Sequence, residues 1–392
     1  MSANRILTTH VGSLVRPPKL AEFLRSAEDG EGLDRQAFGS CLSESIAEVV
    51  RQQKDVGVGI VSDGEFGKSH SWSRYIIDRL AGFDVKTEES ASGLKKGEVI
   101  SAGHDRRLFP EFYAEYDKSQ GFRAAMGTWV CTGPIRYTGQ ELLKRDIDNL
   151  KAAMAAAGVE EGFLPVVAPA SVAPERRDEH YKDDEAFMFG IAGALAEEYR
   201  TIIEAGLYVQ VDDAHLPFMY DRMVPPASLA DYRKWAQVRI EALNHALKGL
   251  PEERIRYHIC WGSFNSPHIG DVALKDIVDL VLQVKAGAYC IEAANPRHEH
   301  EWRVWENVKL PDGKTLIPGV ISHATNIVEH PELVAERLEK YAGLVGRENV
   351  MAGTDCGFAQ GPLVRRVHPS IQWAKLSAMA EGAKIASERL WR

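Results

Sequence analysis

The chain lacks the features that mark membrane, secreted and disulfide-rich proteins. It contains no run of eighteen consecutive apolar residues, and its N-terminus, MSANRILTTHVGS, has no apolar stretch followed by a small-residue cleavage site. We therefore expect no membrane partner and predict a cytoplasmic protein. Five cysteines in 392 residues do not make a disulfide framework. In a reducing compartment, a cysteine that does more than pack is expected to bind metal or act in catalysis.

The chain also lacks an excess of positive charge. Its 47 Lys+Arg residues face 56 Asp+Glu residues, which gives a net charge of -9, and no basic stripe is interleaved with aromatic residues. We therefore expect no nucleic-acid partner. No linker rich in proline or in glycine and serine divides the sequence, and no internal repeat is present. The length exceeds that of most single domains, so it allows either one barrel or two domains. Because no linker divides the chain, we predict a single domain over residues 1–392.

Short apolar runs that end in polar or small residues recur along the chain, and segments with helical spacing separate them. The helical pattern is long over 187–206 and over 271–287. Repeated alternation of strand and helix predicts a parallel sheet, and eight units predict an α/β fold of the (β/α)8 TIM-barrel type. The eight runs are residues 6–13, 58–65, 162–168, 208–213, 255–260, 288–292, 316–322 and 350–355.

One region breaks this alternation, from about Asp84 to Tyr137. It contains the polar stretch GHDRRLFPEFYAEYDKSQGF, followed by the strand-like AAMGTWVCTGPI. We interpret residues 84–137 as an insertion within the barrel domain that forms a hairpin-like arm. Such an arm is expected to cover the barrel mouth or to contact a second subunit in a homo-oligomer.

Ionisable residues lie at the predicted strand ends, where the active sites of barrels are built. His258 and Cys260 are two residues apart in one strand, so both side chains face the same side. The next strand ends in Glu292, and Cys356 follows the last strand. Taken alone, each residue is more often a packing or surface residue than a ligand. Together they offer one nitrogen, one oxygen and two sulfur donors, which favours a tetrahedral zinc ion, Zn2+.

In this order, the segments TTHVGSLVRP, SDGE, VQVDD, HICWGSFN, YCIE, GVISH and GTDCG resemble the catalytic half of cobalamin-independent methionine synthase. The resemblance implies the same zinc site, a thiol substrate held by Ser13, Glu65 and Asp212, and His323 as a proton shuttle. The segments HICWGSFNSPHIGD and EAANPRHEHEW resemble a short subgroup of that superfamily, which includes epoxyalkane:coenzyme M transferase. The family motif VDEP reads VDDA here, at residues 211–214.

These patterns predict an enzyme that alkylates a thiol. A proton donor should assist the departing group, with His323 as first candidate and Asp213 as second. Glu65 and Asp212 are expected to bind a substrate ammonium group, unless they only form salt bridges with Arg16 or Arg74. Arg16, with Arg297 also available, suits a sulfonate.

Three choices stay open at this stage. Trp261 either walls the pocket or packs on a neighbouring helix, and His323 either moves a proton or caps a helix beginning near Asn326. The histidines at 10, 268, 298 and 300 are expected to be surface residues. The reaction is predicted to be methyl transfer to homocysteine or a similar thiol from a methyl-folate-like donor. Its alternatives are epoxide opening by a thiolate such as coenzyme M, and metal-free decarboxylation of the uroporphyrinogen decarboxylase type.

Overall fold

The computed structural model describes residues 4–28, 34–86, 103–119, 128–172 and 176–392. Its main sheet is parallel, and nearly every residue in its strands is buried. Burial on both faces explains why these segments read as continuous apolar runs. The strands, in sheet order, are β3 (Phe163–Val167), β5 (Tyr208–Asp212), β6 (Ile255–Ile259), β7 (Ala288–Ile291), β8 (Thr315–Ile321) and β9 (Gly353–Thr354).

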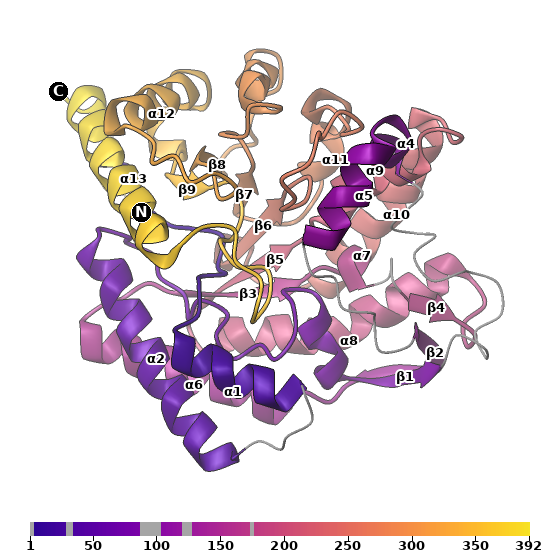
Figure 1. Cartoon of the computed structure of the whole chain (residues 1–392). Helices are drawn as coiled ribbons and strands as arrows, with labels where there is room; N and C mark the ends of the chain where they lie inside the picture. The colour runs from indigo at the N-terminus through magenta and orange to yellow at the C-terminus, as the bar shows by residue number, and fades with distance from the viewer. Residues whose placement is uncertain (1–3, 29–33, 87–102, 120–127, 173–175) are drawn as a thin grey trace.

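The first two apolar runs close this sheet into a ring. Thr8 forms a parallel bridge with Ala352, and Val61 forms one with Gly162. Between them, the carbonyl oxygen of Thr8 accepts hydrogen bonds from the amides of both Gly59 and Ile60, each at 3.1 Å. Because two consecutive amides share one carbonyl, no regular ladder forms there, and these runs contribute bridges instead of full strands. The predicted (β/α)8 barrel is confirmed (Figure 1).

Helices surround the barrel (Figure 1). The long ones are α1 (Pro18–Glu28), α2 (Arg35–Asp55), α6 (Gln140–Ala157), α8 (Asp184–Glu204), α10 (Leu229–Ala246), α12 (Pro331–Val345) and α13 (Pro369–Leu390). Local signals set several of their starts. The side chain of Asp183 caps α8, and Ser228 forms a capping box with Asp231 at the start of α10. Of the described helices, none has both the length and the apolar character needed to cross a bilayer.

Short helices occupy the loops. They are η1 (Arg74–Arg79), α7 (Pro169–Val172), α9 (His215–Met223), η2 (Glu252–Arg254), η3 (Leu274–Asp276), α11 (Val278–Val281), η4 (Glu299–Glu306) and η5 (Arg347–Asn349). The prediction of a long helix over 271–287 is wrong, because only the short helices η3 and α11 form there. Ile277, Val281 and Val284 are all buried, so the segment hides its apolar residues on more than one side. β-branched residues also disfavour a long helix.

A second, smaller sheet lies beside the barrel. In it β1 (Leu80–Lys86) pairs antiparallel with β2 (Thr128–Tyr137), and β4 (Arg176–Asp178) runs parallel to β2. Two helices, α4 (His104–Leu108) and α5 (Pro110–Ser119), lie between these strands in the sequence. Within the expected insertion, residues 87–102 and 120–127 lie outside the described residues. The boundaries of the insertion and the single domain stay predictions.

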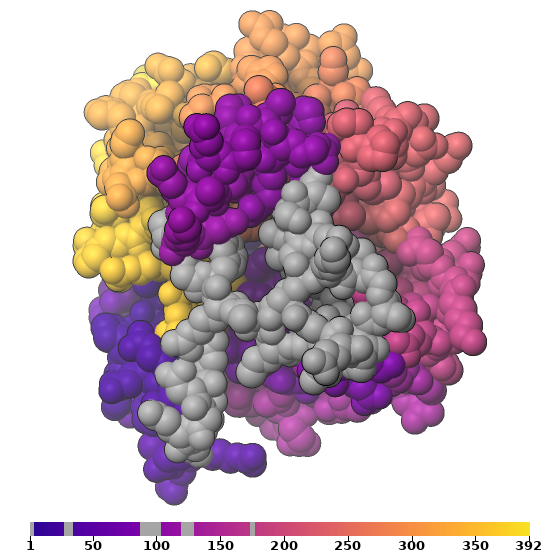
Figure 2. Space-filling view, turned by 45° about the vertical axis from the view of Figure 1, so that its right-hand side comes forward, coloured from indigo at the N-terminus to yellow at the C-terminus, as the bar shows by residue number. Residues whose placement is uncertain are grey.

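The helices α4 and α5 lie against the loops that follow β5 and β6 (Figure 2, purple segment). The hydroxyl of Tyr116 accepts a hydrogen bond from the amide of Asn265 at 3.1 Å. The carboxylate of Asp105 accepts one from the amide of Gly270 at 2.7 Å. Because these loops extend from the carboxyl ends of the strands, α4 and α5 belong to the face of the barrel that carries the ionisable residues.

Candidate metal centre and substrate site

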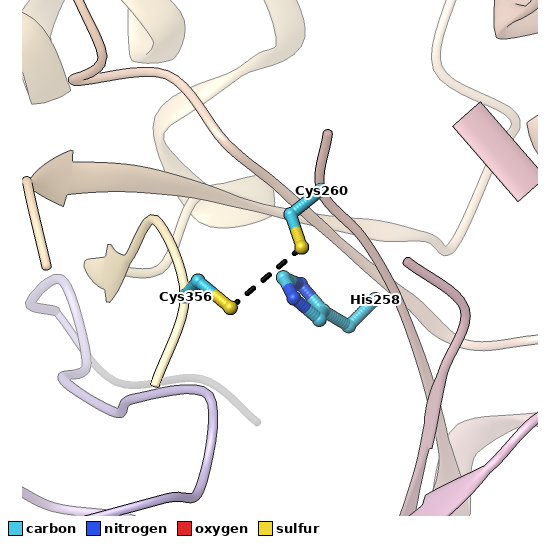
Figure 3. A group of neighbouring side chains, drawn as sticks. All are labelled: His258, Cys260 and Cys356. Atoms are coloured by element: carbon cyan, nitrogen blue, oxygen red, sulfur yellow. Dashed lines mark hydrogen bonds between the residues drawn. The ribbon is translucent and has the colours of Figure 1, made fainter. Parts of the chain in front are cut away.

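Three of the four predicted metal ligands come together at the barrel mouth. His258 lies in β6 and Cys260 directly follows it, while Cys356 lies in the loop after β9. Their side chains point toward one another (Figure 3), and one donor atom from each lies within 4.8 Å of the other two. The two Sγ atoms are 3.6 Å apart. The alternation of side chains in a strand places His258 and Cys260 on the same face, as expected.

The two thiols shift each other's pKa in opposite directions. The hydrogen bond from Cys260 lowers the pKa of Cys356 well below its usual range, while the same contact and burial raise the pKa of Cys260 far above it. Burial lowers the pKa of His258, but the nearby Cys356, Asp212 and Glu292 outweigh it and raise the value. The structure therefore concentrates negative charge at this point, which favours binding of a cation.

The donor set fits zinc. His258 is only 2 % exposed, yet neither of its ring nitrogens has a hydrogen-bond partner among the described residues. A buried imidazole without partners is costly, and a metal ion satisfies it. One nitrogen and two sulfur donors match zinc better than magnesium or calcium, which prefer oxygen. The hydroxyl of Ser263 also contacts Sγ of Cys356 at 3.0 Å.

The fourth predicted ligand, Glu292, falls in a neighbouring group. Its carboxylate clusters with His323 and Asp355, again with donor atoms within 4.8 Å of one another. Its two oxygens accept hydrogen bonds from the amide of Trp261 at 3.2 Å and from the side chain of Asn295 at 2.9 Å. The charge of Glu292 contributes to the pKa values of both His258 and His323. Glu292 thus lies close to both groups, and its place among the zinc ligands stays a prediction.

Asp355 connects two loops at this second group. One of its oxygens accepts hydrogen bonds from the amides of Ala293 and Ala294, both at 2.7 Å, which ties the loop after β9 to the loop after β7. Burial, followed by the charge of Glu292, raises its pKa well above the usual range. A glycine makes room for it, because a Cβ atom on Gly319 would lie 2.6 Å from the backbone nitrogen of Asp355.

Two of the three predicted thiol-binding residues, Ser13 and Glu65, meet at a sharp turn. Gly64 and Glu65 both have left-handed backbones, with φ values of 69° and 62°, which is rare for a glutamate. The turn places the carboxylate of Glu65 3.5 Å from the hydroxyl of Ser13 and 3.5 Å from Nζ of Lys68. Strained backbone of this kind is often retained where function requires it.

Arg16 supports the same turn. One of its terminal nitrogens donates to the carbonyls of Glu65 and Lys68. Its Nε and Nη1 atoms are buried and have no hydrogen-bond partner in the described part of the chain. Burial lowers the pKa of Arg16 to about 10, so it remains a cation at neutral pH. Arg16 contacts the backbone of Glu65, so the expected alternative of a salt bridge with the Glu65 side chain is not seen.

Two consecutive carboxylates lie at the end of β5, with Asp212 as its last residue and Asp213 directly after it. Burial raises the pKa of Asp212 to about 7 and that of Asp213 to about 6. Asp212 accepts a hydrogen bond from Gln210 at 2.9 Å. Asp213 accepts from the hydroxyls of Ser171 at 2.8 Å and Tyr257 at 2.9 Å. Both values lie near neutral pH, which suits groups that exchange protons.

His323 is buried, and burial lowers its pKa. Both of its ring nitrogens lack hydrogen-bond partners among the residues that the structure places. The helix after it, α12, begins at Pro331 and is capped by His330, so His323 caps no helix. Trp261 is fully buried, and its indole donates to the carbonyl of Val272 at 2.7 Å. The structure gives Trp261 packing contacts, and its contact with substrate stays a prediction.

Sequence reasoning overlooked several residues of this region. Lys68 has a buried ammonium group beside Glu65, and its only sequence signal is its spacing of three residues from that glutamate. The expectation of surface histidines is wrong for His10, His268 and His298, which are buried, whereas His300 is exposed. The signal for His268 and His298 was present, because both lie in the motifs that resemble the short subgroup.

A (β/α)8 barrel with buried thiol, imidazole and carboxylate groups at the carboxyl ends of its strands has the architecture of an enzyme. Residues 168–383 match the family described as "Cobalamin-independent synthase, Catalytic domain". This match covers more than half of the chain, and the protein belongs to that family. The resemblance expected from the sequence motifs is thereby confirmed.

Relatives of two activities are similar to the chain. A methionine synthase of Saccharolobus islandicus is 24% identical over 98% of this chain and 96% of its own length. A 2-hydroxypropyl-CoM lyase of Xanthobacter autotrophicus is also 24% identical, over the same shares. A B12-independent methionine synthase structure from Shewanella sp., in complex with selenomethionine, superposes with a TM-score of 0.72. It is 21% identical and covers 98% of this chain and 99% of that one, which supports the fold.

Proposed function

We propose that this protein is a zinc-dependent thiol S-alkyltransferase. The observation that carries the proposal is the cluster of His258, Cys260 and Cys356, whose donor atoms lie within 4.8 Å of one another. We assign these residues and Glu292 as the ligands of one zinc ion. A zinc ion held by these residues would supply a Lewis acid that keeps a substrate thiol deprotonated and nucleophilic.

The residues around the turn at Glu65 bind the rest of the thiol substrate. The carboxylates of Glu65 and Asp212 suit an ammonium group, and the hydroxyl of Ser13 lies beside Glu65. The unpartnered nitrogens of Arg16 and the ammonium of Lys68 suit an acidic group on the same molecule. An amino-acid thiol such as homocysteine has both groups, and it is the acceptor that we propose.

The reaction forms one sulfur–carbon bond and breaks one bond from carbon to nitrogen or oxygen. The thiol proton is lost, and the departing atom gains a proton. His323 is our candidate donor of that proton, because it is buried beside Glu292 and neither ring nitrogen is paired within the described ranges. Asp213 is the second candidate, since its pKa is raised to about 6 by burial.

Epoxide opening is the second candidate function. It is favoured by the similarity to the 2-hydroxypropyl-CoM lyase, which equals the similarity to the methionine synthase at 24% identity. The buried, unpartnered nitrogens of Arg16 would equally receive a sulfonate. Parallel assays of thiol consumption, with methyl donors and with epoxides, separate the two reactions. A metal-free decarboxylase would not explain why His258, Cys260 and Cys356 lie together.

Metal analysis tests the proposal. We expect about one zinc ion per chain in the parent protein and little in Cys260→Ser and Cys356→Ser. Cys41→Ser is the matched control, because Cys41 is buried in α2 and contacts only Ser45 among the polar groups described. Full zinc retention by both site variants would overturn the proposal.

A further inference from the structure

Two buried histidines near the metal centre share one carboxylate. Oδ2 of Asp271 lies 2.8 Å from Nδ1 of His268 and 2.9 Å from Nε2 of His298. The second nitrogen of His298 lies 2.8 Å from Glu301, and the second nitrogen of His268 lies 2.9 Å from the carbonyl of Phe264. Each imidazole therefore has an oxygen acceptor on both nitrogens. A neutral imidazole donates only one hydrogen bond, so this geometry favours the doubly protonated cation for both rings.

The His298 ring also stacks on Trp261. The two ring centroids are 3.9 Å apart, and the planes differ by only 19°. A cation face to face with an indole is held by both packing and electrostatic attraction. His298 is 3 % exposed and Trp261 is 0 % exposed, so water does not weaken the contact. The stacked histidine and the hydrogen bond from the indole to the carbonyl of Val272 together hold the indole in place.

Trp261 connects this cluster to the proposed ligands. It directly follows Cys260, and its backbone amide donates to Glu292 at 3.2 Å. His298 belongs to the loop after β7, which begins at Glu292, whereas Asp271 belongs to the loop after β6, which begins at Cys260. The amide of Leu274 also donates to Glu301 at 2.7 Å. The cluster thus joins the two loops whose first residues are Cys260 and Glu292.

We propose that His298, held by Asp271 and Glu301, is a positioning residue for the metal site and acts through Trp261 on Cys260 and Glu292. This inference rests on the proposed zinc site. It also gives a function to the segments PHIGD and PRHEHE. Asp271 of the first segment contacts His298 of the second, and His298 contacts Glu301. Groups that orient metal ligands from behind change metal affinity by about 10–100-fold when they are lost.

A double-mutant cycle on zinc affinity tests the inference. The zinc dissociation constant is measured by chelator competition for the parent, His298→Gln, Trp261→Phe and the double variant. We expect His298→Gln to weaken zinc binding by about tenfold or more. In the Trp261→Phe background, we expect the same substitution to have much less effect, because its route to Cys260 is already lost. Equal losses in the two backgrounds would exclude action through the indole.

Arg239→Gln is a matched control for general destabilisation. Arg239 is a buried cation that pairs with Asp184 at 2.6 Å and lies 4.3 Å from the ring centre of Trp235, on the outer helices. It should lower thermal stability without changing zinc affinity. Glu301→Gln is a milder second variant, since an amide oxygen still accepts from Leu274, and it should weaken zinc binding in the same direction.

The outcomes separate this inference from the proposed function. A parent protein without zinc overturns both. A parent that binds zinc, together with His298→Gln at unchanged affinity, overturns only the positioning role. Equal weakening by Arg239→Gln also overturns it, because the loss would then follow from reduced stability.

Discussion

The Sγ atoms of Cys260 and Cys356 lie 3.6 Å apart, although 96 positions separate the two residues in the chain. They are thiols in this structure, as are the other three cysteines. The contact joins the loop after β6 to the loop after β9 at the barrel mouth. It places two sulfur donors where one ion can bind both, and it also brings together two groups that an oxidant can link.

Metal removal should expose this pair to oxidation. After chelation, treatment with diamide should convert the two thiols to one disulfide, with the diamide taking up two electrons and two protons. Thiol titration of the denatured protein should then fall from the five free cysteines to three. Zinc added before the oxidant should preserve all five. Loss of the same two thiols with zinc bound would contradict shared coordination.

Glu65→Gln should weaken binding of a thiol that carries an ammonium group. A charge-assisted hydrogen bond contributes about 1.5–3 kcal/mol, so KM should rise by roughly one to two orders of magnitude. Zinc content should not change, because Glu65 belongs to the run before β3 and not to the metal cluster. Steady-state kinetics with homocysteine checks this. Asp78→Asn, at a partly exposed residue of η1, should leave KM unaltered.

His323→Gln should slow transfer most when the departing group needs a proton. General acid catalysis contributes about 10²–10⁴-fold, and kcat should fall within that range for a poor leaving group. With an activated methyl donor, whose leaving group departs without a proton, the loss should be much smaller. Measuring kcat on both donors distinguishes the roles. An equal loss on both would indicate that His323 supports the structure of the site instead.

Gly319→Ala should displace Asp355 and, with it, Cys356. The added Cβ would lie 2.6 Å from both the backbone nitrogen and Cα of Asp355, and backbone atoms cannot rotate away as a side chain can. Overpacking of this kind costs about 1–3 kcal/mol of stability. We expect a lower unfolding midpoint together with weaker zinc binding. Gly193→Ala, in α8, meets no atom within 4 Å and should have neither effect.

The free energy of unfolding should decrease as His268 and His298 lose their positive charge with rising pH. Burial alone would lower the pKa of His268 and His298, but hydrogen bonds to Asp271 and, for His298, to Glu301 outweigh it and raise both values to about 9. Because these values exceed the unfolded value of about 6.5, the stabilisation is fully present below that pH. It should be lost as pH rises through about 9.

Urea unfolding between pH 6.5 and 9.5 checks this expectation. The parent should lose stability over that interval, and a His268→Gln, His298→Gln double variant should lose less. Parallel slopes for the two proteins would refute the assignment of charge to the pair. Leu376→Ala serves as the reference for a destabilised protein, because it removes a buried apolar side chain of α13 and neither adds nor removes a titratable group.

Much of the fold follows from patterns that lie close together in the sequence. A buried parallel strand reads as a short apolar run, and a helix reads as a periodic one, so the barrel could be predicted from 58–65, 162–168 and the other runs. The same local rule predicted that His258 and Cys260 share a face, because side chains alternate along a strand. The rule for helices failed over 271–287. There the chain is buried on several sides, which gives a similar apolar sequence pattern without a long helix.

The finer arrangement of the site arises from contacts between loops, and loop paths leave no periodic signal. No spacing rule places Asp355 beside Glu292, or makes His268 and His298 share Asp271. Each histidine, read alone, resembles a surface residue, and its charge depends on acceptors supplied by another loop. The residue order alone therefore determined which ionisable residues lie at the strand ends. Their hydrogen-bond partners, burial and protonation depend on the tertiary structure, because closing the barrel brings loops that are distant in the sequence into contact.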